Sequence, residues 1–451
     1  MTRQQEKLGG PLHNDPPSKR FYLPIKYKFL VSHGVALLWM CLSIWLSIPW
    51  LLDLAKITGI FLAALIIMGI SYIPGYMNAF MVCSLLIDRQ PALKVKRPQE
   101  PLTILIACRN EEQRIEETIR YIAGQDYDGH LKVIVIDNRS TDQTAEQARQ
   151  AAEKYRVDLT VLYEPVPGKN HALNAALSRV ETALMITLDA DTLLHKSAIR
   201  FIVSRLRTSP DDVCAVAGAV LVRNSRGNIL ARMQEWDYFL GIASIKRLQG
   251  LFQGTLVAQG AFSLYKTEAV RQVGGWPDAI GEDIVLTWRF LGRNWRVYFE
   301  PLAVAFTDVP ENFIHFVRQR SRWARGMIEA LKIIKPWQQP IPYVRYLTSC
   351  NYIMPYLDFT YTLFWMPGLV LACFGYYWIV GPYTLFVLPL TLLQNFTLYR
   401  YQQNVFRTLQ LRIRKNKLGF VLYVLCYQMI MSPVSVWGYL QEFMQLKRVW
   451  K

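Results

Sequence analysis

The sequence lacks the cysteine, histidine and glycine patterns that mark several common classes of protein. Its seven cysteines are scattered without a CxxC pair, and its six histidines show no paired spacing. This argues against a disulfide framework and a structural zinc site, and it favours a reducing compartment for the soluble part. There is no GxGxxG or GxxxxGK motif, which argues against a dinucleotide cofactor and a P-loop. No internal repeat or low-complexity tract is present.

Acidic residues are also scarce relative to basic ones. The 451 residues include 51 Lys and Arg but only 34 Asp and Glu, so the formal net charge is +17. With 52% hydrophobic and 19% charged residues, the chain is too apolar for a typical soluble enzyme and too charged for a pure membrane bundle. The basic residues cluster beside apolar runs, so we expect a membrane protein with one soluble domain and no nucleic-acid partner.

Two apolar runs in residues 29–88 predict membrane-spanning helices. Residues 29–52 and 57–82 are each long enough to cross a bilayer, with a short turn expected at 53–56. Basic residues lie outside both ends of this pair, at Lys19, Arg20, Lys26, Lys28, Arg89, Lys94, Lys96 and Arg97. By the positive-inside rule, the tail 1–28 and the chain after residue 88 are predicted to be cytoplasmic.

Residues 336–451 are expected to hold an interfacial segment and about three further membrane segments. The apolar stretches are 352–372, 383–398 and 418–446, the last with an expected break at Pro433. Two amphipathic helices, 225–250 and 400–417, are expected on an anionic membrane surface. For the first of them, a helix in a soluble core is the alternative.

Residues 99–335 alternate short apolar runs with amphipathic segments. Strands are expected at 102–108, 131–137, 159–163, 184–188 and 213–222, and helices at 111–125 and 140–155, the latter capped by Ser140 or Thr141. This alternation predicts a mostly parallel, doubly wound α/β sheet. Ligands of such sheets bind at the carboxyl ends of the strands, where candidate site residues should be sought.

Polar residues follow three of the expected strands. Asn110 and Glu111 follow the first, Asp137 ends the second, and Asp189 and Asp191 follow the fourth. The side chains of Asp189 and Asp191 point the same way, so their repulsion would be relieved by Mg²⁺ or Mn²⁺ bridging to a diphosphate. The alternative is that these residues only form turns and cap helices.

Three further candidates lie outside those strand ends. Lys169 follows a glycine and can reach a phosphate as a mobile point charge. Glu282 and Asp283 open an expected helix, where a carboxylate can act as general base toward a hydroxyl or simply balance the helix dipole.

The stretch VRQRSRWARG, residues 317–326, is expected to be helical. Gln319, Arg322 and Trp323 then share one face, at positions i, i+3 and i+4. That face offers an amide, a guanidinium that binds phosphate, and an indole against which a sugar ring can lie. The alternative is a solvated basic face beside the membrane.

These motifs together resemble the membrane-embedded family 2 glycosyltransferases, which include synthases of cellulose, chitin, hyaluronan and poly-N-acetylglucosamine. The resemblance covers about residues 100–335 and rests on Asp137, Asp189-Ala-Asp191, Glu282-Asp283 and Gln319-Arg-Ser-Arg322-Trp323, in that order. It implies a cytoplasmic glycosyltransferase-A (Rossmann-like) domain inserted between N-terminal and C-terminal transmembrane helices.

The resemblance also implies a role for each motif. Asp137 would contact the uridine of a UDP-sugar, with Lys169 near the nucleotide, and Asp189 and Asp191 would hold Mg²⁺ or Mn²⁺ and the ribose–diphosphate. Asp283, next to Glu282, would be the general base. The face of Gln319, Arg322 and Trp323 would line the acceptor end of the site and grip the diphosphate.

The sequence departs from the family pattern at two motifs. Asn138 and Arg139 stand where many relatives have Asp-Gly, and Gly281 stands where many have Thr. Gly281 resembles hyaluronan and nodulation-chitin synthases, whereas Ile284, Trp288 and residues 259–266 resemble poly-N-acetylglucosamine synthases.

The expected function is therefore a processive inverting transferase that uses a UDP-sugar, with UDP-N-acetylglucosamine as first choice. It would extend a β-linked polysaccharide in a bacterial inner membrane and export it through its spans, with a small membrane partner subunit as in some relatives. The alternatives are transfer of a single sugar to a lipid acceptor, and a transporter with an inactive cytoplasmic domain.

Overall fold

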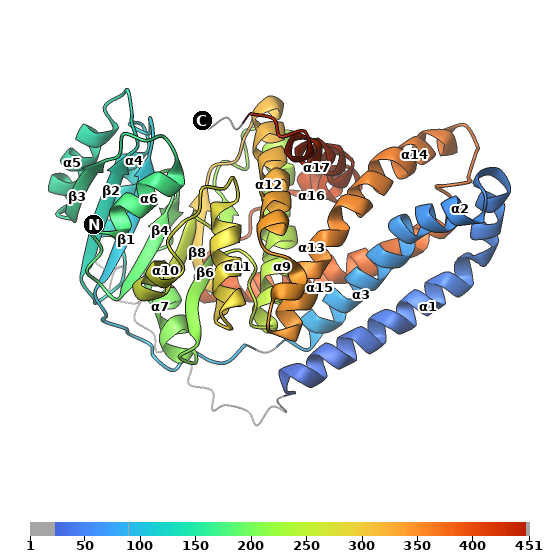
Figure 1. Cartoon of the computed structure of the whole chain (residues 1–451), viewed down its shortest axis with the longest axis horizontal. Coiled ribbons are helices and arrows are strands. Elements are labelled where there is room, and N and C mark those ends of the chain that lie inside the picture. The colour runs from blue at the N-terminus through green and yellow to red at the C-terminus, as the bar shows by residue number, and fades with distance from the viewer. Residues whose placement is uncertain (1–22, 89, 448–451) are drawn as a thin grey trace, which may run out of the picture.

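The computed structural model describes residues 23–88 and 90–447, apart from the side chains of 385–388. Most of the expected basic tail, residues 1–28, falls outside the described residues, as do Arg89 and the end of the C-terminal tail. Figure 1 shows the sheet and its covering helices at one side of the molecule. From the other side extend the helices α1 Ile25–Thr58, α2 Ile60–Ile67, α3 Ile73–Leu86, α13 Pro342–Thr360, α14 Met366–Cys373 and α15 Val387–Thr408. Helices α9, α11 and α12 lie between these two parts.

The soluble part is built on an eight-stranded sheet with the strand order β3-β2-β1-β4-β7-β6-β8-β5. The strands are β1 Leu102–Cys108, β2 Leu131–Asp137, β3 Asp158–Tyr163, β4 Leu184–Leu188, β5 Leu193–Leu194, β6 Val213–Val222, β7 Phe262–Lys266 and β8 Arg296–Thr307. Strands β1 to β4 are parallel, whereas β7 runs antiparallel to both β4 and β6. The predicted α/β sheet is confirmed, and β5, β7 and β8 are strands that the periodicity did not predict.

The helices of this domain are α4 Ile115–Ala123, α5 Thr144–Tyr155, α6 Lys169–Leu177, α7 Ala198–Thr208, α10 Thr267–Gln272 and α11 Glu282–Gly292. Two predicted helix starts were wrong, because α4 and α5 each begin four residues later than expected. The preceding loops are bonded to each other: Ser140 Oγ accepts from the Asn110 backbone N–H at 3.0 Å, and Asn110 Oδ1 accepts from the Thr141 N–H at 2.8 Å. Ser140 and Thr141 therefore join two loops and do not cap α5.

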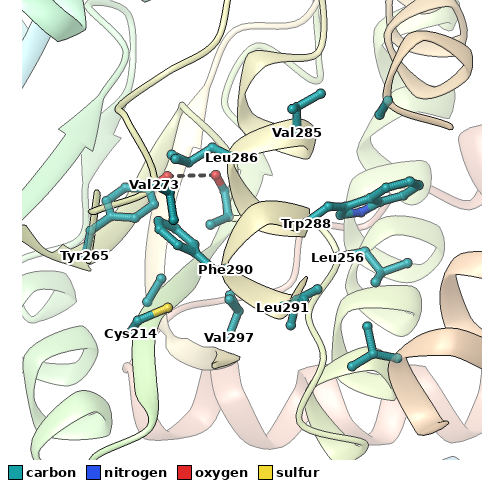
Figure 2. Packing of buried hydrophobic residues seen from close by; sticks show 14 of the residues in the cluster. Cys214, Leu256, Tyr265, Val273, Val285, Leu286, Trp288, Phe290, Leu291 and Val297 are labelled. Atoms are coloured by element: carbon teal, nitrogen blue, oxygen red, sulfur yellow. Dashed lines mark hydrogen bonds between the residues drawn. The ribbon is translucent and has the colours of Figure 1, made fainter. Parts of the chain in front are cut away.

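Alternation along the strands gives the sheet two buried faces. On β1, Leu105 points into one core, which it shares with residues of α6, α11 and the apolar helices α1 and α3. Ile104 and Ile106 point into the other core, which is covered by α4, α5 and α7. Figure 2 shows the first core, where Phe290 of α11 lies near residues of β6, β7 and β8 and Trp288 points to the other side of the helix, toward Leu256. This packing fixes α11, whose N-terminus carries Glu282 and Asp283.

Protein covers much of the apolar stripes of the two predicted surface helices. Helix α8 Ile229–Trp236, the π-turn η2 Asp237–Ile242 and helix α9 Ala243–Leu251 follow one another without a break. Trp236 and Leu240 are buried with Val405 and Leu409, so this part of the apolar stripe packs against protein. Whether the segment also contacts a membrane surface stays a prediction. For the second segment the predicted helix bounds were wrong, because α15 Val387–Thr408 ends before residue 417. Val405 and Leu409 of this segment's apolar stripe are buried by protein.

Three helical segments among the described residues are long and apolar enough to cross a membrane: Ile25–Thr58, Ile60–Leu86 and Lys417–Phe443. They comprise α1 Ile25–Thr58, then α2 Ile60–Ile67, η1 Met68–Tyr72 and α3 Ile73–Leu86, and finally α16 Lys417–Leu422, η6 Tyr423–Tyr427 and α17 Gln428–Phe443. The turn predicted at 53–56 was wrong, because α1 continues to Thr58 and the chain turns at Gly59, whose φ is 79°.

The break predicted at Pro433 was also wrong, because α17 runs through that residue. Proline is tolerated in such helices when neighbouring groups satisfy the freed carbonyl. The stretch 352–372 falls in α13 Pro342–Thr360, η4 Tyr361–Trp365 and α14 Met366–Cys373, which follow the short η3 Pro336–Gln338. The stretch 383–398 falls in η5 Pro382–Phe386 and α15. That these two stretches cross the membrane stays a prediction.

Helix α12, Phe313–Ile333, contacts the start of α11 backbone to backbone. A Cβ atom on Gly281 would lie 2.9 Å from the carbonyl oxygen of Gly326, and one on Gly326 would lie 2.9 Å from the Gly281 nitrogen. This is the physical reason for a glycine at position 281. The contact fixes the distance between the N-terminus of α11 and the middle of α12.

We expect Gly326→Ala to destabilise the protein, because the new methyl group must push α11 away from α12. Overpacking of this kind costs about 1–3 kcal/mol. Gly292→Ala is the matched control, because it lies at the other end of α11 with no atom within 4 Å of the added Cβ. Thermal unfolding of the detergent-solubilised chain should show a lower midpoint for Gly326→Ala only. Equal midpoints for both variants would contradict the close contact.

Candidate active site

The loops after β1 and β2 bring Asn110, Glu111 and Asp137 to one edge of the sheet. Asp137 is buried, and its Oδ1 accepts from the Ser140 N–H at 2.9 Å. Asn110 adopts a left-handed backbone, with φ of 58°, and its side chain bonds the neighbouring loop. The structure therefore gives Asn110 a clear role in shaping the rim, and its contact with a nucleotide stays a prediction.

Asn138 is a site residue whose role the sequence did not reveal. It is buried, its Nδ2 donates to the carbonyl oxygens of Glu164 and Val166 at 3.1 and 2.7 Å, and its Oδ1 accepts from the Gly168 N–H at 2.7 Å. A carboxylate could not make the two donated bonds. An asparagine at position 138 thus has a structural role, because its side chain holds the loop that leads into Lys169.

Lys169 opens α6, and its ammonium group forms an ion pair with Asp189. Asp191 accepts only distant hydroxyl contacts, 3.4 Å each, from Thr192 and Thr307. Burial, and next the charge of Asp189, raises the pKa of Asp191. Burial and then Asp191 likewise raise the pKa of Glu111. The predicted convergence of strand-end carboxylates is therefore present. Its neighbouring cations are Lys169, paired with Asp189, and Arg114, which lies 3.6 Å from Glu111.

These carboxylates fit a hard divalent cation. Within the described residues no three His, Cys, Asp or Glu side chains are placed to hold a metal ion. Asp189 and Asp191 instead offer a two-carboxylate site, and Mg²⁺ or Mn²⁺ commonly completes such a site with phosphate oxygens and water. A cation here would also offset the repulsion that raises the pKa values of Asp191 and Glu111.

Asp283 is held at the N-terminus of α11. Its Oδ1 accepts from the Ile284 N–H at 2.9 Å, and its Oδ2 accepts from the Gly260 N–H at 3.3 Å. The neighbouring Glu282 has its pKa raised to about 7, first by burial and then by Asp283, while Lys169 and Arg322 oppose the shift. The electrostatic contacts thus join the start of α6, the start of α11 and the middle of α12 in one site.

Helix α12 confirms the predicted helical reading of residues 317–326 and separates its arginines onto different faces. Arg322 and Trp323 are exposed, and Trp323 is 38% accessible. Arg320 is buried, lies 3.1 Å from Asp237, and has its guanidinium carbon 4.2 Å from the centre of the Trp323 ring. Arg325 pairs with Glu442 of α17 at 3.1 Å.

The basic stretch therefore has two uses. Arg320 and Arg325 anchor α12, whereas the predicted face of Gln319, Arg322 and Trp323 remains available to a ligand. Gln319 is partly buried, and its Oε1 has no hydrogen-bond partner among the described residues. Buried oxygens of this kind are normally satisfied, so a ligand hydroxyl fits here. Asp237 was missed from the sequence, because only the tertiary fold brings η2 against α12.

Lys246 of α9 is a second missed residue. Its ammonium group is buried and donates to the Val257 carbonyl oxygen at 2.7 Å. Burial lowers its pKa to about 8, against the opposing effect of Asp283. Lys246 thus places positive charge against the segment 257–260. The Gly260 N–H of the same segment donates to Asp283. A lone lysine in an amphipathic helix gave no sequence signal for this position.

Comparison with known proteins agrees with this geometry. Residues 98–326 match the family described as glycosyltransferase like family 2. Poly-beta-1,6-N-acetyl-D-glucosamine synthase of Staphylococcus aureus is 33% identical over 246 residues, which cover 54% of this chain and 58% of that protein. The synthase of Staphylococcus epidermidis is 30% identical over 268 residues, covering 59% and 64%. The matches therefore span less than two thirds of these relatives.

A solved structure supports the fold. The mannosyltransferase PcManGT from Pyrobaculum calidifontis, in complex with GDP-Man and Mn²⁺, superposes with a TM-score of 0.59 at 19% identity and covers 88% of this chain and 100% of its own. With the family match over residues 98–326, this chain belongs to glycosyltransferase family 2, and its soluble part has the glycosyltransferase-A fold.

Proposed function

We propose that this chain is an inverting β-glycosyltransferase that extends a polysaccharide from a UDP-sugar, with UDP-N-acetylglucosamine as the donor. The observation that carries the proposal is the placement of Asp283, a carboxylate fixed by two backbone N–H groups beside the Lys169–Asp189 pair. The poly-N-acetylglucosamine synthases among the relatives support the choice of sugar.

The donor half of the site would hold the nucleotide. Asp137 and the rim formed by Asn110 and Glu111 would bind the uridine and ribose, while Lys169 would contact the diphosphate. Asp189 and Asp191 would hold Mg²⁺ or Mn²⁺, which when bound neutralises charge on the leaving diphosphate. The Mn²⁺ in the similar mannosyltransferase structure supports such an ion.

Asp283 would act as the general base. Its carboxylate accepts the proton of an acceptor hydroxyl while that oxygen attacks the anomeric carbon from the face opposite the diphosphate. The new carbon–oxygen bond forms as the bond to UDP breaks, and UDP leaves with the electron pair. An α-linked donor thus gives a β-linked product. Glu282, partly protonated near neutral pH, would limit the negative charge beside the base.

The face of α12 would receive the acceptor sugar. Trp323 provides a flat surface, and the guanidinium of Arg320 on one side of the ring fixes its orientation. Arg322 has no ion-pair partner among the described residues, so it can turn to the diphosphate. The ion pair of Arg325 with α17 connects this face to an apolar helix fit to span a membrane.

That connection supports processive synthesis with export of the polymer through the membrane helices. The catalytic domain would then lie on the cytoplasmic side of a bacterial inner membrane, as Lys94, Lys96 and Arg97 after the second span favour. A small membrane partner subunit stays a prediction from the resemblance. Transfer of one sugar to a lipid acceptor uses the same site chemistry, so product length must distinguish the two functions.

We expect Asp283→Asn to reduce sugar transfer at least about 100-fold, because the amide cannot accept the proton. The purified full chain in lipid, with Mg²⁺ or Mn²⁺ and labelled UDP-N-acetylglucosamine, would provide the assay. Glu268→Gln, an exposed carboxylate on α10, is the matched control and should transfer normally. Transfer by Asp283→Asn at the unmutated rate would contradict the assigned base.

The same assay tests product length. We expect the unmutated chain to form labelled polymer of high molecular weight that is absent with Asp283→Asn. A short, lipid-soluble product would instead establish single-sugar transfer. Incorporation from UDP-glucose or UDP-glucuronate but not from UDP-N-acetylglucosamine would overturn the choice of donor while leaving the reaction class intact.

Glu282→Gln should stabilise the protein at alkaline pH. The folded state raises the pKa of Glu282 from its ordinary 4.5 to about 7. The folded chain therefore holds the proton more tightly, and stability falls as the pH rises from 4.5 through 7. Glutamine avoids this loss, so the variant should unfold at a higher temperature than the unmutated chain at about pH 8, with little difference at about pH 5.

Glu153→Gln, on an exposed position of α5, is the control for this measurement and should show no such pH-dependent gain. If Glu282→Gln changed the unfolding temperature by the same amount at both pH values, that result would refute the raised pKa of Glu282.

A further inference from the structure

A cavity of about 140 Å³ lies well outside the proposed active site, where the start of α8 meets the segment before α16. Its lining residues are Arg226, Arg232, Lys415, Asn416, Lys417 and Leu418. Four of these six side chains are basic, and no acidic side chain lines the cavity itself. Such a concentration of one charge in a hollow attracts an anion.

Hydrogen bonds of Asn416 fix the shape of this cavity. Its Nδ2 donates to the Arg232 carbonyl oxygen at 2.9 Å and to Glu235 Oε2 at 2.6 Å, and its carbonyl oxygen accepts from Trp236 Nε1 at 2.9 Å. Its Oδ1 accepts from the Gly419 N–H at 3.1 Å, which caps α16. The basic residues are thus carried on two segments that are joined to each other.

The charges of the cavity are only partly compensated. Glu235 pairs with Arg226 at 2.8 Å. Arg232, Lys415 and Lys417 have no ion-pair partner among the described residues. The Nε atom of Arg232 is shielded from solvent and makes no hydrogen bond within the described part of the chain. A buried donor without an acceptor costs free energy, which an anionic oxygen in the cavity would recover.

The surface beside the cavity is apolar. Leu418, which lines the cavity, is 51% exposed, and Val421 and Leu425 further along the same helical segment are 48% and 58% exposed. They belong to the segment Lys417–Phe443, which is long and apolar enough to cross a membrane. On α8, Ile229 is 53% exposed. A basic cavity is therefore continuous with an exposed apolar stripe at the end of a candidate span.

We propose that this cavity binds the phosphate headgroup of an anionic phospholipid, whose acyl chains lie along Leu418, Val421 and Leu425. The basic side chains match the phosphate, and the exposed stripe matches the acyl chains. Inorganic phosphate or a soluble nucleotide would leave that stripe uncovered. The inference is independent of the sugar-transfer reaction, because no residue of the proposed active site belongs to the cavity.

Lipid binding to the full-length chain in neutral detergent would test this proposal. Native mass spectrometry with phosphatidylglycerol, and separately with phosphatidylcholine, would give the affinities. Arg232→Gln combined with Lys415→Gln should weaken phosphatidylglycerol binding by about 30-fold, because each basic residue near an anionic lipid contributes about fivefold. The matched control, Arg412→Gln with Arg414→Gln, removes the same charge from exposed positions of the same loop.

Retention of phosphatidylglycerol by the control and its loss by the cavity variant would support the site. Equal weakening in both variants would overturn it in favour of general charge attraction. Equal affinity for phosphatidylcholine, or competition by inorganic phosphate at similar concentration, would overturn the anionic lipid as ligand. Thermal unfolding without added lipid would confirm that both variants are folded, and Lys417→Gln alone, expected to weaken binding about fivefold, provides a milder variant.

Discussion

Negative charge collected at one edge of the sheet is the constraint on which the rest of the site depends. Asp189 and Asp191 follow one strand, Glu111 follows another, and Glu282 and Asp283 open α11, so several carboxylates interact in a small volume. Burial first, and then their mutual repulsion, raises the pKa values of Asp191, Glu111 and Glu282. Neighbouring cations on α6 and α12 only partly offset it. The arrangement is stable because the sheet and the packed face of α11 hold the chain in place.

The same constraint explains why α12 carries its positive charge on two faces. On the accessible face, Arg322 lies near the carboxylates. The buried arginines form ion pairs that hold the helix, Arg320 with Asp237 and Arg325 with Glu442. A helix with arginines on one face only could either bind a charged ligand or hold its own position. The close contact of Gly281 with Gly326 then sets the spacing between base and acceptor platform.

Much of the sheet and the site could be predicted from sequence, because strand ends and helix faces follow from local periodicity. The first strands, the paired carboxylates and the face of Gln319, Arg322 and Trp323 are of this kind. Properties that depend on tertiary contact could not be predicted. The antiparallel β7, the loop anchor Asn138 and the buried Arg320–Asp237 pair need the whole fold. The burial of Trp236, Leu240, Val405 and Leu409 by protein belongs to the same class, since an apolar stripe does not reveal whether lipid or protein covers it.

One consequence follows from the attachment of α12 to the last apolar helix. Asp237 accepts from Tyr427 of η6 at 2.8 Å and also pairs with Arg320, and Arg325 reaches Glu442 near the other end of that helix. Helix α12, which carries Trp323, and the last apolar helix are thereby joined at two separated points. Helices adjust their tilt to the thickness of the surrounding bilayer. A change in the tilt of this helix would therefore move α12 and, with it, Trp323, the surface on which a sugar ring would rest.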